Sequence, residues 1–357
     1  MKAAAHRLTN KPARRHAGFA LLRLSLACLA TLGVVTSGGE ATATTPTRDV
    51  HTLPTMLKAR GFKPPAKFKA LVIPLGRVDG SKRDPSPRRL SYNGTAWDRD
   101  DWWPASTVKL YAAIAALETT RRLGMRPRAR ATFRYPDKAR KGRISGLVHM
   151  ALVPSNNLAF DRLVELVGAQ DFNERFLSPR NGLGDTVMLR SYYGRVRLEG
   201  TNIGTNRDSP EIVIEDKGVR STLPARYMRK ELPCEEEGNC TTLDNLAEAL
   251  RRVMLHEKLP ASERFALGPR ELDVLRRALR HRKKRGNGVV DGLREGFGKG
   301  LTVAHKPGYS RKWFSDVVYA FDERSGRAWI VAMAGFPGRH CLDRAAQHVG
   351  ALLRKLQ

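Results

Sequence analysis

The sequence has few cysteines and few aromatic residues. Four cysteines occur in 357 residues, and Phe, Trp and Tyr together contribute 7%. The cysteines and the nine histidines show no spacing typical of a zinc site, so we expect no metal. The chain also lacks internal repeats, low-complexity tracts and a glycine-rich phosphate loop. These absences argue against repeat proteins and common nucleotide-binding proteins, and we expect no cofactor.

Acidic residues are scarce relative to basic ones. There are 35 Asp and Glu against 64 Lys and Arg, a formal net charge of +29. Such an excess favours anionic partners, such as lipid headgroups or acidic wall polymers. The densest basic block, Arg276–Arg285, has few interleaved aromatics, so we expect no nucleic acid partner. High arginine usage across a genome would also explain the charge.

Only one long uncharged apolar run is present, and it lies near the N-terminus. A pair of arginines precedes it, the run Leu24–Val35 is too short to span a membrane, and Ala41–Ala43 offers a small-residue cleavage site. We interpret residues 1–43 as a secretory signal peptide. We therefore expect export to the periplasm or the extracellular space.

The remaining chain is long enough for one domain with an inserted lobe. Residues 44–66 are polar and contain Pro and Thr, which is typical of a linker, and residues 67–357 form the predicted domain. We expect a monomer. In an oxidising compartment, Cys234 and Cys240 could form a local disulfide around a short loop.

The most informative feature is Ser106-Thr107-Val108-Lys109, at the start of an apolar, alanine-rich run predicted to be helical. Three residues are almost one helical turn, so Ser106 and Lys109 can touch. A partly desolvated lysine amine can take the serine proton and so activate the hydroxyl as a nucleophile. Free N–H groups of the first turn could form half of an oxyanion hole. Alone the motif is weak, because an N-cap serine followed by a solvated lysine has the same pattern.

Two further motifs follow. Pro154–Asn157 should be a tight connection between helices over Ile144–Leu152 and Leu158–Val167. Lys306–Gly308 ends a short β-like run that leads into a predicted hairpin over residues 314–334. Taken singly, each of these motifs is an ordinary loop or turn.

In this order, the three motifs resemble the Ser-x-x-Lys, Ser-x-Asn and Lys-Thr-Gly set of class A β-lactamases and penicillin-binding proteins. The resemblance covers about residues 67–357. It implies an α/β fold of the α+β type, in which an antiparallel sheet is flanked by helices and an all-helical lobe is inserted. It also implies a β-lactamase-like serine hydrolase that opens a cyclic amide through an acyl-enzyme, an activity associated with antibiotic resistance.

The resemblance implies a role for each motif residue. Ser106 would be the nucleophile and Lys109 its base, while Ser155, helped by Lys306, would pass a proton to the leaving nitrogen. The charge of Lys306 would also draw the substrate carboxylate. The N–H of Tyr309 would complete the oxyanion hole. The predicted substrate-binding residues are Asn157, Gly308, Tyr309 and Ser310.

Two departures from the family pattern affect substrate binding and turnover. Pro307 replaces the family's Thr or Ser and offers neither a hydroxyl nor an N–H, so carboxylate binding should be weaker unless Ser310 supplies a hydroxyl. No Glu-x-x-Leu-Asn loop is present to activate the deacylating water. Glu199 is the best substitute, with Glu211 and Glu215 behind it, although all three could be solvated loop charges.

Two other functions therefore stay open. One is a D-alanyl-D-alanine peptidase or an esterase on the same scaffold, acting on a peptidoglycan-like or ester substrate. The missing glutamate loop favours it. The other is a non-catalytic binder of anionic cell-envelope polymers, which Pro307 and the positive charge favour.

Overall fold

The computed structural model describes most of the chain beyond its N-terminal region. The described residues are 48–64, 67–80, 87–96, 102–191, 196–197, 204–205, 207–234, 238–281, 287–310, 313–335 and 340–356. They belong to one compact unit, Thr44–Gln357. Residues 1–43 lie outside the described residues, so the signal peptide stays a prediction. Of the helices described, none combines the length and the apolar character that a membrane span requires.

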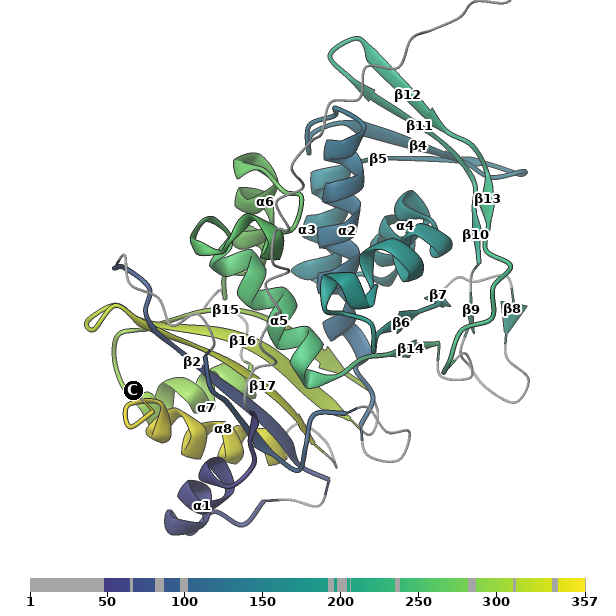
Figure 1. Ribbon diagram of the computed structural model, residues 1–357. Coiled ribbons are helices and arrows are strands. Elements are labelled where there is room, and N and C mark those ends of the chain that lie inside the picture. Colours follow the sequence, from purple (N-terminus) through teal and green to yellow (C-terminus); the bar gives the residue numbers. More distant parts are fainter. Residues whose placement is uncertain are drawn as a thin grey trace, which may run out of the picture. The chain divides into compact units, whose positions relative to one another are not determined.

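A six-stranded sheet with the strand order β1-β3-β2-β17-β16-β15 forms one layer (Figure 1). Its strands are β1 (Arg48–Asp49), β2 (Lys69–Arg77), β3 (Arg89–Tyr92), β15 (Leu301–Tyr309), β16 (Phe314–Asp322) and β17 (Arg327–Gly335). All neighbours are antiparallel except the short pair β1–β3. Strands from both ends of the domain meet where β2 pairs with β17. The antiparallel sheet and the hairpin predicted over 314–334 are confirmed.

Helices cover both faces of this sheet. α7 (Gly288–Phe297) and α8 (His340–Leu353) pack on one face, and α5 (Leu243–Met254) packs on the other (Figure 1). Val317 and Val318 are neighbours on β16 but belong to two different hydrophobic cores. Successive side chains of a strand point to opposite faces, so one strand contributes to both cores. This double burial explains the nearly continuous apolar sequence of the central strands.

The second layer is built around α2 (Lys109–Arg122). Each residue from Lys109 to Thr120 is buried, and the helix contacts four others. Those are α5 and, in addition, α3 (Ile144–Leu152), α4 (Asn157–Val167) and α6 (Pro269–Leu279). Short turns of 3-10 or π type are η1 (Ala105–Val108), η2 (Asp171–Phe176), η3 (Pro179–Asn181), η5 (His256–Lys258) and η6 (Ala261–Glu263). The helices predicted on both sides of Pro154–Asn157 are confirmed as α3 and α4.

The prediction that the inserted lobe is all-helical is wrong. The lobe contains a four-stranded sheet of order β12-β11-β4-β5. Its strands are β4 (Arg130–Arg134), β5 (Ala139–Arg143), β11 (Glu211–Asp216) and β12 (Val219–Leu223). Shorter ladders are formed by β6 (Val187–Met188) with β14 (Asn239–Cys240), by β10 (Asp208–Ser209) with β13 (Arg226–Tyr227), and by β7 (Arg190–Ser191), β8 (Val196–Arg197) and β9 (Gly204–Thr205).

The β11–β12 hairpin has a local cause in the sequence. Lys217 and Gly218 both have positive φ, 48° and 81°, between the paired residues Asp216 and Val219. Two consecutive positive φ values are typical of the two-residue turn whose twist matches that of the strands it joins. The run Glu211–Asp216 with this turn was the signal that the sequence analysis missed when it considered Glu211 and Glu215 only as loop residues.

The predicted linker over residues 44–66 is folded over its described residues, 48–64, so the prediction is wrong there. The segment contains β1 and the helix α1 (Thr52–Ala59), and Leu53 and Leu57 are fully buried. These leucines are four residues apart and so lie on one face of the helix. The Asp49 carboxylate accepts the backbone N–H of Thr52 at 2.8 Å, which stabilises the start of α1. The segment is therefore part of the folded domain.

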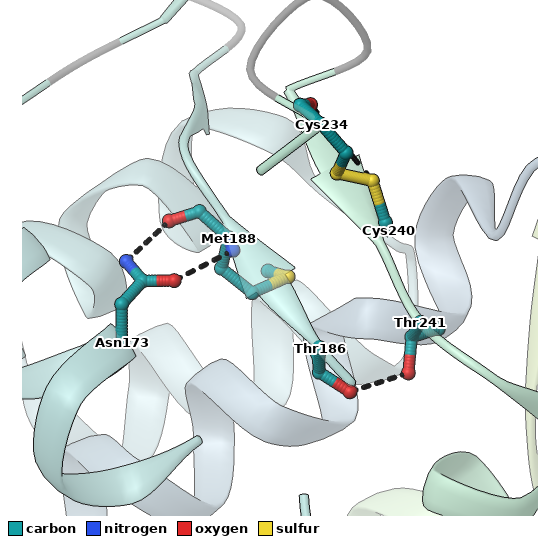
Figure 2. Close-up of a disulfide and its surroundings, with 6 residues drawn as sticks. All are labelled: Asn173, Thr186, Met188, Cys234, Cys240 and Thr241. Carbon is teal, nitrogen blue, oxygen red and sulfur yellow. Dashed lines mark hydrogen bonds between the residues drawn. A yellow bond between two sulfur atoms is a disulfide. The ribbon is translucent and has the colours of Figure 1, made fainter. Parts of the chain in front are cut away.

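Cys234 and Cys240 form a disulfide at the end of β14 (Figure 2). β14 pairs with β6, and the side-chain amide of Asn173 donates to Met188 O at 3.0 Å and accepts from Met188 N at 2.9 Å. The hydroxyls of Thr186 and Thr241 lie 2.8 Å apart in the same region (Figure 2). The disulfide thus joins two segments that flank a short loop next to an already well-bonded ladder.

Candidate active site

Ser106 lies in the tight turn η1, immediately before α2, rather than in an α-helical turn. The preceding Ala105 has φ +47°, a left-handed conformation that costs a non-glycine residue energy. The N–H and the hydroxyl of Thr107 donate to Pro104 O at 3.1 and 2.6 Å. These bonds hold the turn, and Ser106 is only partly buried while its neighbours are buried. Strain of this kind is typical of a functional site.

The amine of Lys109 lies at the centre of the three motifs. It is 3.0 Å from Ser106 Oγ, 3.2 Å from Ser155 Oγ, 2.6 Å from Ser155 O and 2.6 Å from Asn157 Oδ1. Lys109 is 1% exposed. The predicted contact between Ser106 and Lys109 is therefore present, and the amine lies within reach of the serine proton.

Ser155 connects the two lysines. Its backbone has φ +59° in the connection between α3 and α4, and its hydroxyl accepts from Lys306 Nζ at 2.9 Å. The neighbouring Asn156 caps α4, because its Oδ1 accepts the N–H of Ala159 at 2.8 Å. Asn is among the most favourable N-cap residues, so Asn156 stabilises this connection.

Lys306 is fully buried on β15 and donates to Ser155 Oγ at 2.9 Å and Pro307 O at 3.0 Å. Burial lowers the pKa of Lys306 to about 7, with a further contribution from the charge of Lys109, while Asp316 opposes the shift. A lysine with such a pKa can exchange a proton near neutral pH. The structure thus places Lys306 where the motif comparison predicted it.

The depressed pKa of Lys306 predicts a stability that rises with pH. Between about 7 and the ordinary value of 10.5, the unfolded chain binds this proton and the folded protein does not. Unfolding should therefore become harder across that window, by up to a few kcal/mol. Urea denaturation at pH 7 and 9.5 would measure it. In Lys306→Met this part of the pH dependence should vanish, and an unchanged slope would contradict the assignment.

Pro307 occupies a position in the sheet that tolerates proline. β15 is the edge strand and pairs with β16 alone in this sheet, so a residue without an N–H is tolerated there. Pro307 lies opposite Asp316 on β16, and its carbonyl accepts from Lys306.

Gly308 packs directly against the serine turn. A Cβ on this residue would lie 2.5 Å from Pro104 O, 2.9 Å from Ser315 Oγ and 3.0 Å from Thr107 N. Two of these three atoms belong to the backbone and cannot rotate away. Gly308, predicted to bind substrate, is therefore required for the close approach of β15 to Ser106.

We expect Gly308→Ala to separate β15 from η1. The overpacking should destabilise the fold by about 1–3 kcal/mol, visible as a lower Tm. Gly146→Ala on α3 is a matched control, because its nearest contact would be 3.8 Å and alanine favours a helix. Equal Tm values for the two variants would contradict this interpretation of Gly308.

The remaining predicted substrate residues end β15. Tyr309 is 63% exposed, and its ring packs against the edge of Phe314. The Ser310 hydroxyl accepts the N–H of Trp313 at 3.0 Å, and the Ser310 N–H donates to Trp313 O at 2.9 Å. Because this turn already uses the Ser310 hydroxyl, it is a poor replacement for the hydroxyl absent at Pro307.

Of the three glutamates proposed for deacylation, the two that the structure describes lie on the lobe sheet. Glu199 lies outside the described residues. Glu211 and Glu215 lie on β11 of the lobe sheet, where they pair with Arg134 at 2.8 Å and Arg220 at 3.9 Å and stay substantially exposed. These two glutamates therefore have the solvated, surface role that was the alternative interpretation.

The sequence analysis missed Asp316, a buried carboxylate beside the motif strand. It is 1% exposed, and its Oδ2 lies 2.9 Å from His305 Nδ1. The second ring nitrogen of His305, Nε2, lies 3.0 Å from His281 Nδ1. An aspartate within the apolar run of β16 was the available signal, since a buried charge needs a partner.

Comparison with known proteins supports the same assignment of fold. The model of the β-lactamase enzyme family matches residues 92–353. The structure of PBP-A is similar with a TM-score of 0.53 and 19% identity, over 87% of this chain and 99% of that one. A β-lactamase from Sphaerobacter thermophilus has a TM-score of 0.53 and 17% identity, over 85% and 96%.

A PBP-A mutant has been solved as an acyl-enzyme complex with penicillin G, with 16% identity and a TM-score of 0.53 over 87% of this chain and 99% of that one. No curated protein matches the chain. At these identities the solved structures show the fold alone, whereas the family model spans both lysine motifs and the connection between them. The chain belongs to the β-lactamase enzyme family.

Proposed function

We propose that this protein is an exported serine hydrolase that opens β-lactam amides through an acyl-enzyme on Ser106. The observation that carries the proposal is one continuous chain of contacts. It runs from Ser106 Oγ to Lys109 Nζ, then to Ser155 Oγ and Lys306 Nζ, in steps of 3.0, 3.2 and 2.9 Å. Such a chain can take a proton from the nucleophile and deliver one to a leaving nitrogen.

In the proposed reaction, Lys109 accepts the Ser106 proton as Oγ forms a bond to the lactam carbonyl carbon. Ser155 then gives its proton to the lactam nitrogen as the C–N bond breaks, and Lys306 replaces that proton. Backbone N–H groups of Ser106 and Tyr309 would hold the oxyanion. Water finally hydrolyses the ester, with Glu199 proposed as its activator.

Intact-protein mass after mixing with penicillin G tests this function. A transient adduct on Ser106 is the result expected for a lactamase. A persistent adduct would favour the D-alanyl-D-alanine peptidase alternative, in which water cannot reach the ester. Absence of any adduct would overturn the proposal in favour of an esterase or a binder.

Pro307→Thr should improve the reaction with a penicillin. The added hydroxyl can donate to the substrate carboxylate, and a bond to a charged group is worth about 1.5–3 kcal/mol, or roughly a 10- to 150-fold gain in kcat/KM. Pro307→Ala removes the proline without adding a hydroxyl and serves as the control. If the threonine variant lost activity toward every substrate, the cleft would be shaped for a peptide or an ester instead.

The anionic partner remains a second proposal, and a concave surface of the lobe supports it. A cavity of about 360 Å³ next to the start of α6 is lined mainly by basic residues. The lining residues are Arg126, Pro127, Arg128, Arg270, Asp273, Val274 and Arg277. Asp216 neutralises Arg126, and Asp273 pairs with Arg277. Arg128 and Arg270 form no ion pair with any described residue, so this cavity has a positive excess that suits phosphate groups.

Binding of sodium tripolyphosphate at low salt tests this surface. The double variant Arg128→Gln, Arg270→Gln should bind at least several-fold more weakly, and the loss should shrink as salt rises. The matched control is Arg140→Gln, Arg143→Gln on the exposed strand β5, which removes the same charge elsewhere. Equal losses in both variants would mean that only the overall charge attracts the anion.

A further inference from the structure

The edge of the sheet beside Lys306 holds a hydrogen-bonded chain of three titratable groups that the proposed acylation does not use. The chain runs from Asp316 on β16 to His305 on β15 and on to His281, over 2.9 and 3.0 Å. Asp316 is almost fully buried. Its other oxygen, Oδ1, is also buried and has no hydrogen-bond partner among the described residues. The carboxylate charge is therefore only partly compensated by His305.

The contacts determine where the protons lie when both rings are neutral. An ionised carboxylate only accepts, so His305 carries its proton on Nδ1 and uses Nε2 as an acceptor. His281 must then donate from Nδ1, which leaves its Nε2 as the acceptor for one more proton. A proton bound at His281 therefore acts on Asp316 through two hydrogen bonds.

Asp316 also acts on Lys306 across the strand. Pro307, the residue after Lys306, lies directly opposite Asp316 in the β15–β16 ladder. Adjacent residues of β15 point to opposite faces, so Lys306 reaches Ser155 on one face while His305 reaches Asp316 on the other. The negative charge of Asp316 raises the pKa of Lys306, against the effects of burial and of Lys109.

We propose that Asp316 is one counter-ion shared by Lys306 and the His305–His281 pair. A proton taken up by the pair cancels the charge of Asp316. Lys306 then loses the opposite charge that favours its protonated form. Asp316 is thus a positioning residue that acts through Lys306. The effect of Asp316 on catalysis rests on the proposed function. The electrostatic effect of Asp316 on Lys306 and the histidines does not depend on that function.

The charged groups around His281 determine the pH range in which the histidine pair and Lys306 both bind protons near Asp316. Burial and the charge of His305 lower the pKa of His281, with Arg294 on α7 acting in the same direction and Asp291 against it. The pair therefore gains its proton below the ordinary histidine range, on the acidic side of the Lys306 titration. Acidification should therefore act on Lys306 through proton uptake at His281.

Carbon-13 NMR of the lysine side chains in the resting protein tests the proposal without a substrate. The signal of Lys306 is the one missing from Lys306→Met. In wild-type protein it should titrate with a midpoint of about 7 and show a second inflection at lower pH, where His281 gains its proton. Asp316→Asn should lower that midpoint by on the order of one pH unit, because the opposite charge is gone.

Two further variants keep the test decisive. His281→Asn removes the ring that takes up the added proton, so the second inflection of Lys306 should disappear. This variant decides the matter if Asp316→Asn does not fold. Asp322→Asn, on the same strand but at its far end, should leave Lys306 unchanged. An unmoved midpoint in Asp316→Asn, or a wild-type curve in His281→Asn, would overturn the proposal. If no penicillin acylated the wild-type protein, the proposed function would be contradicted. The titration of Lys306 could still be measured, because it needs no substrate.

Discussion

Replacing Ser106 with alanine should abolish labelling by a fluorescent penicillin. In the proposed reaction the ester forms on Ser106 Oγ, so the alanine variant lacks the atom that attacks the carbonyl carbon. Loss of a serine nucleophile typically costs on the order of 10⁶-fold in turnover, as the subtilisin case shows. In-gel fluorescence and intact mass measure the result.

The fold of the Ser106→Ala variant should be unchanged, since the hydroxyl's single described contact is with Lys109. An unchanged Tm therefore accompanies the expected loss. Ser221→Ala, on β12 of the lobe sheet, is the matched control and should label like the wild-type protein. Labelling of Ser106→Ala at another serine would show that Ser106 is not the acylated residue.

Removal of the Lys109 amine should slow acylation by about 10²–10⁴-fold, the usual contribution of a general base. Lys109→Met is preferable to alanine because it keeps most of the buried volume beside Phe160, whose ring lies 5.9 Å from the amine. The measurement is the second-order rate of acylation by a penicillin. The Tm shows whether the variant is folded, and the loss should appear in the acylation rate of the folded variant.

Lys141→Met on the exposed strand β5 provides the control for removing a positive charge. It should acylate at the wild-type rate. If the Lys109 variant slowed by less than about tenfold, below the range of a general base, Lys109 would have a structural role and Lys306 would be the better base candidate.

Much of the site could be predicted because its residues lie in short motifs on regular elements. Ser106 and Lys109 meet through the geometry of a single turn, and the helices around Ser155 follow from apolar spacing. The strand that carries Lys306 was recognised from the hairpin after it. These are local relations, for which a few neighbouring residues contain the necessary information.

Predictions failed where distant segments complete an element. The lobe sheet needs β11 to pair with β4, about eighty residues earlier, and α1 becomes stable only because Leu53 and Leu57 enter the core beneath the main sheet. Both segments, β11 and α1, are short and have polar residues at their ends. The structure of each depends on burial against a partner that the local pattern does not reveal.

The sequence by itself determined the family and the meeting of Ser106 with Lys109, because these depend on residue type and spacing. Only the tertiary structure decided that Gly308 is a packing residue and that Asp316 faces two titratable sites. The physical reason is that close approach and burial are properties of pairs of segments. Gly308 is required because backbone atoms of another segment touch it, and Asp316 acts strongly on its neighbours because burial excludes water from between them.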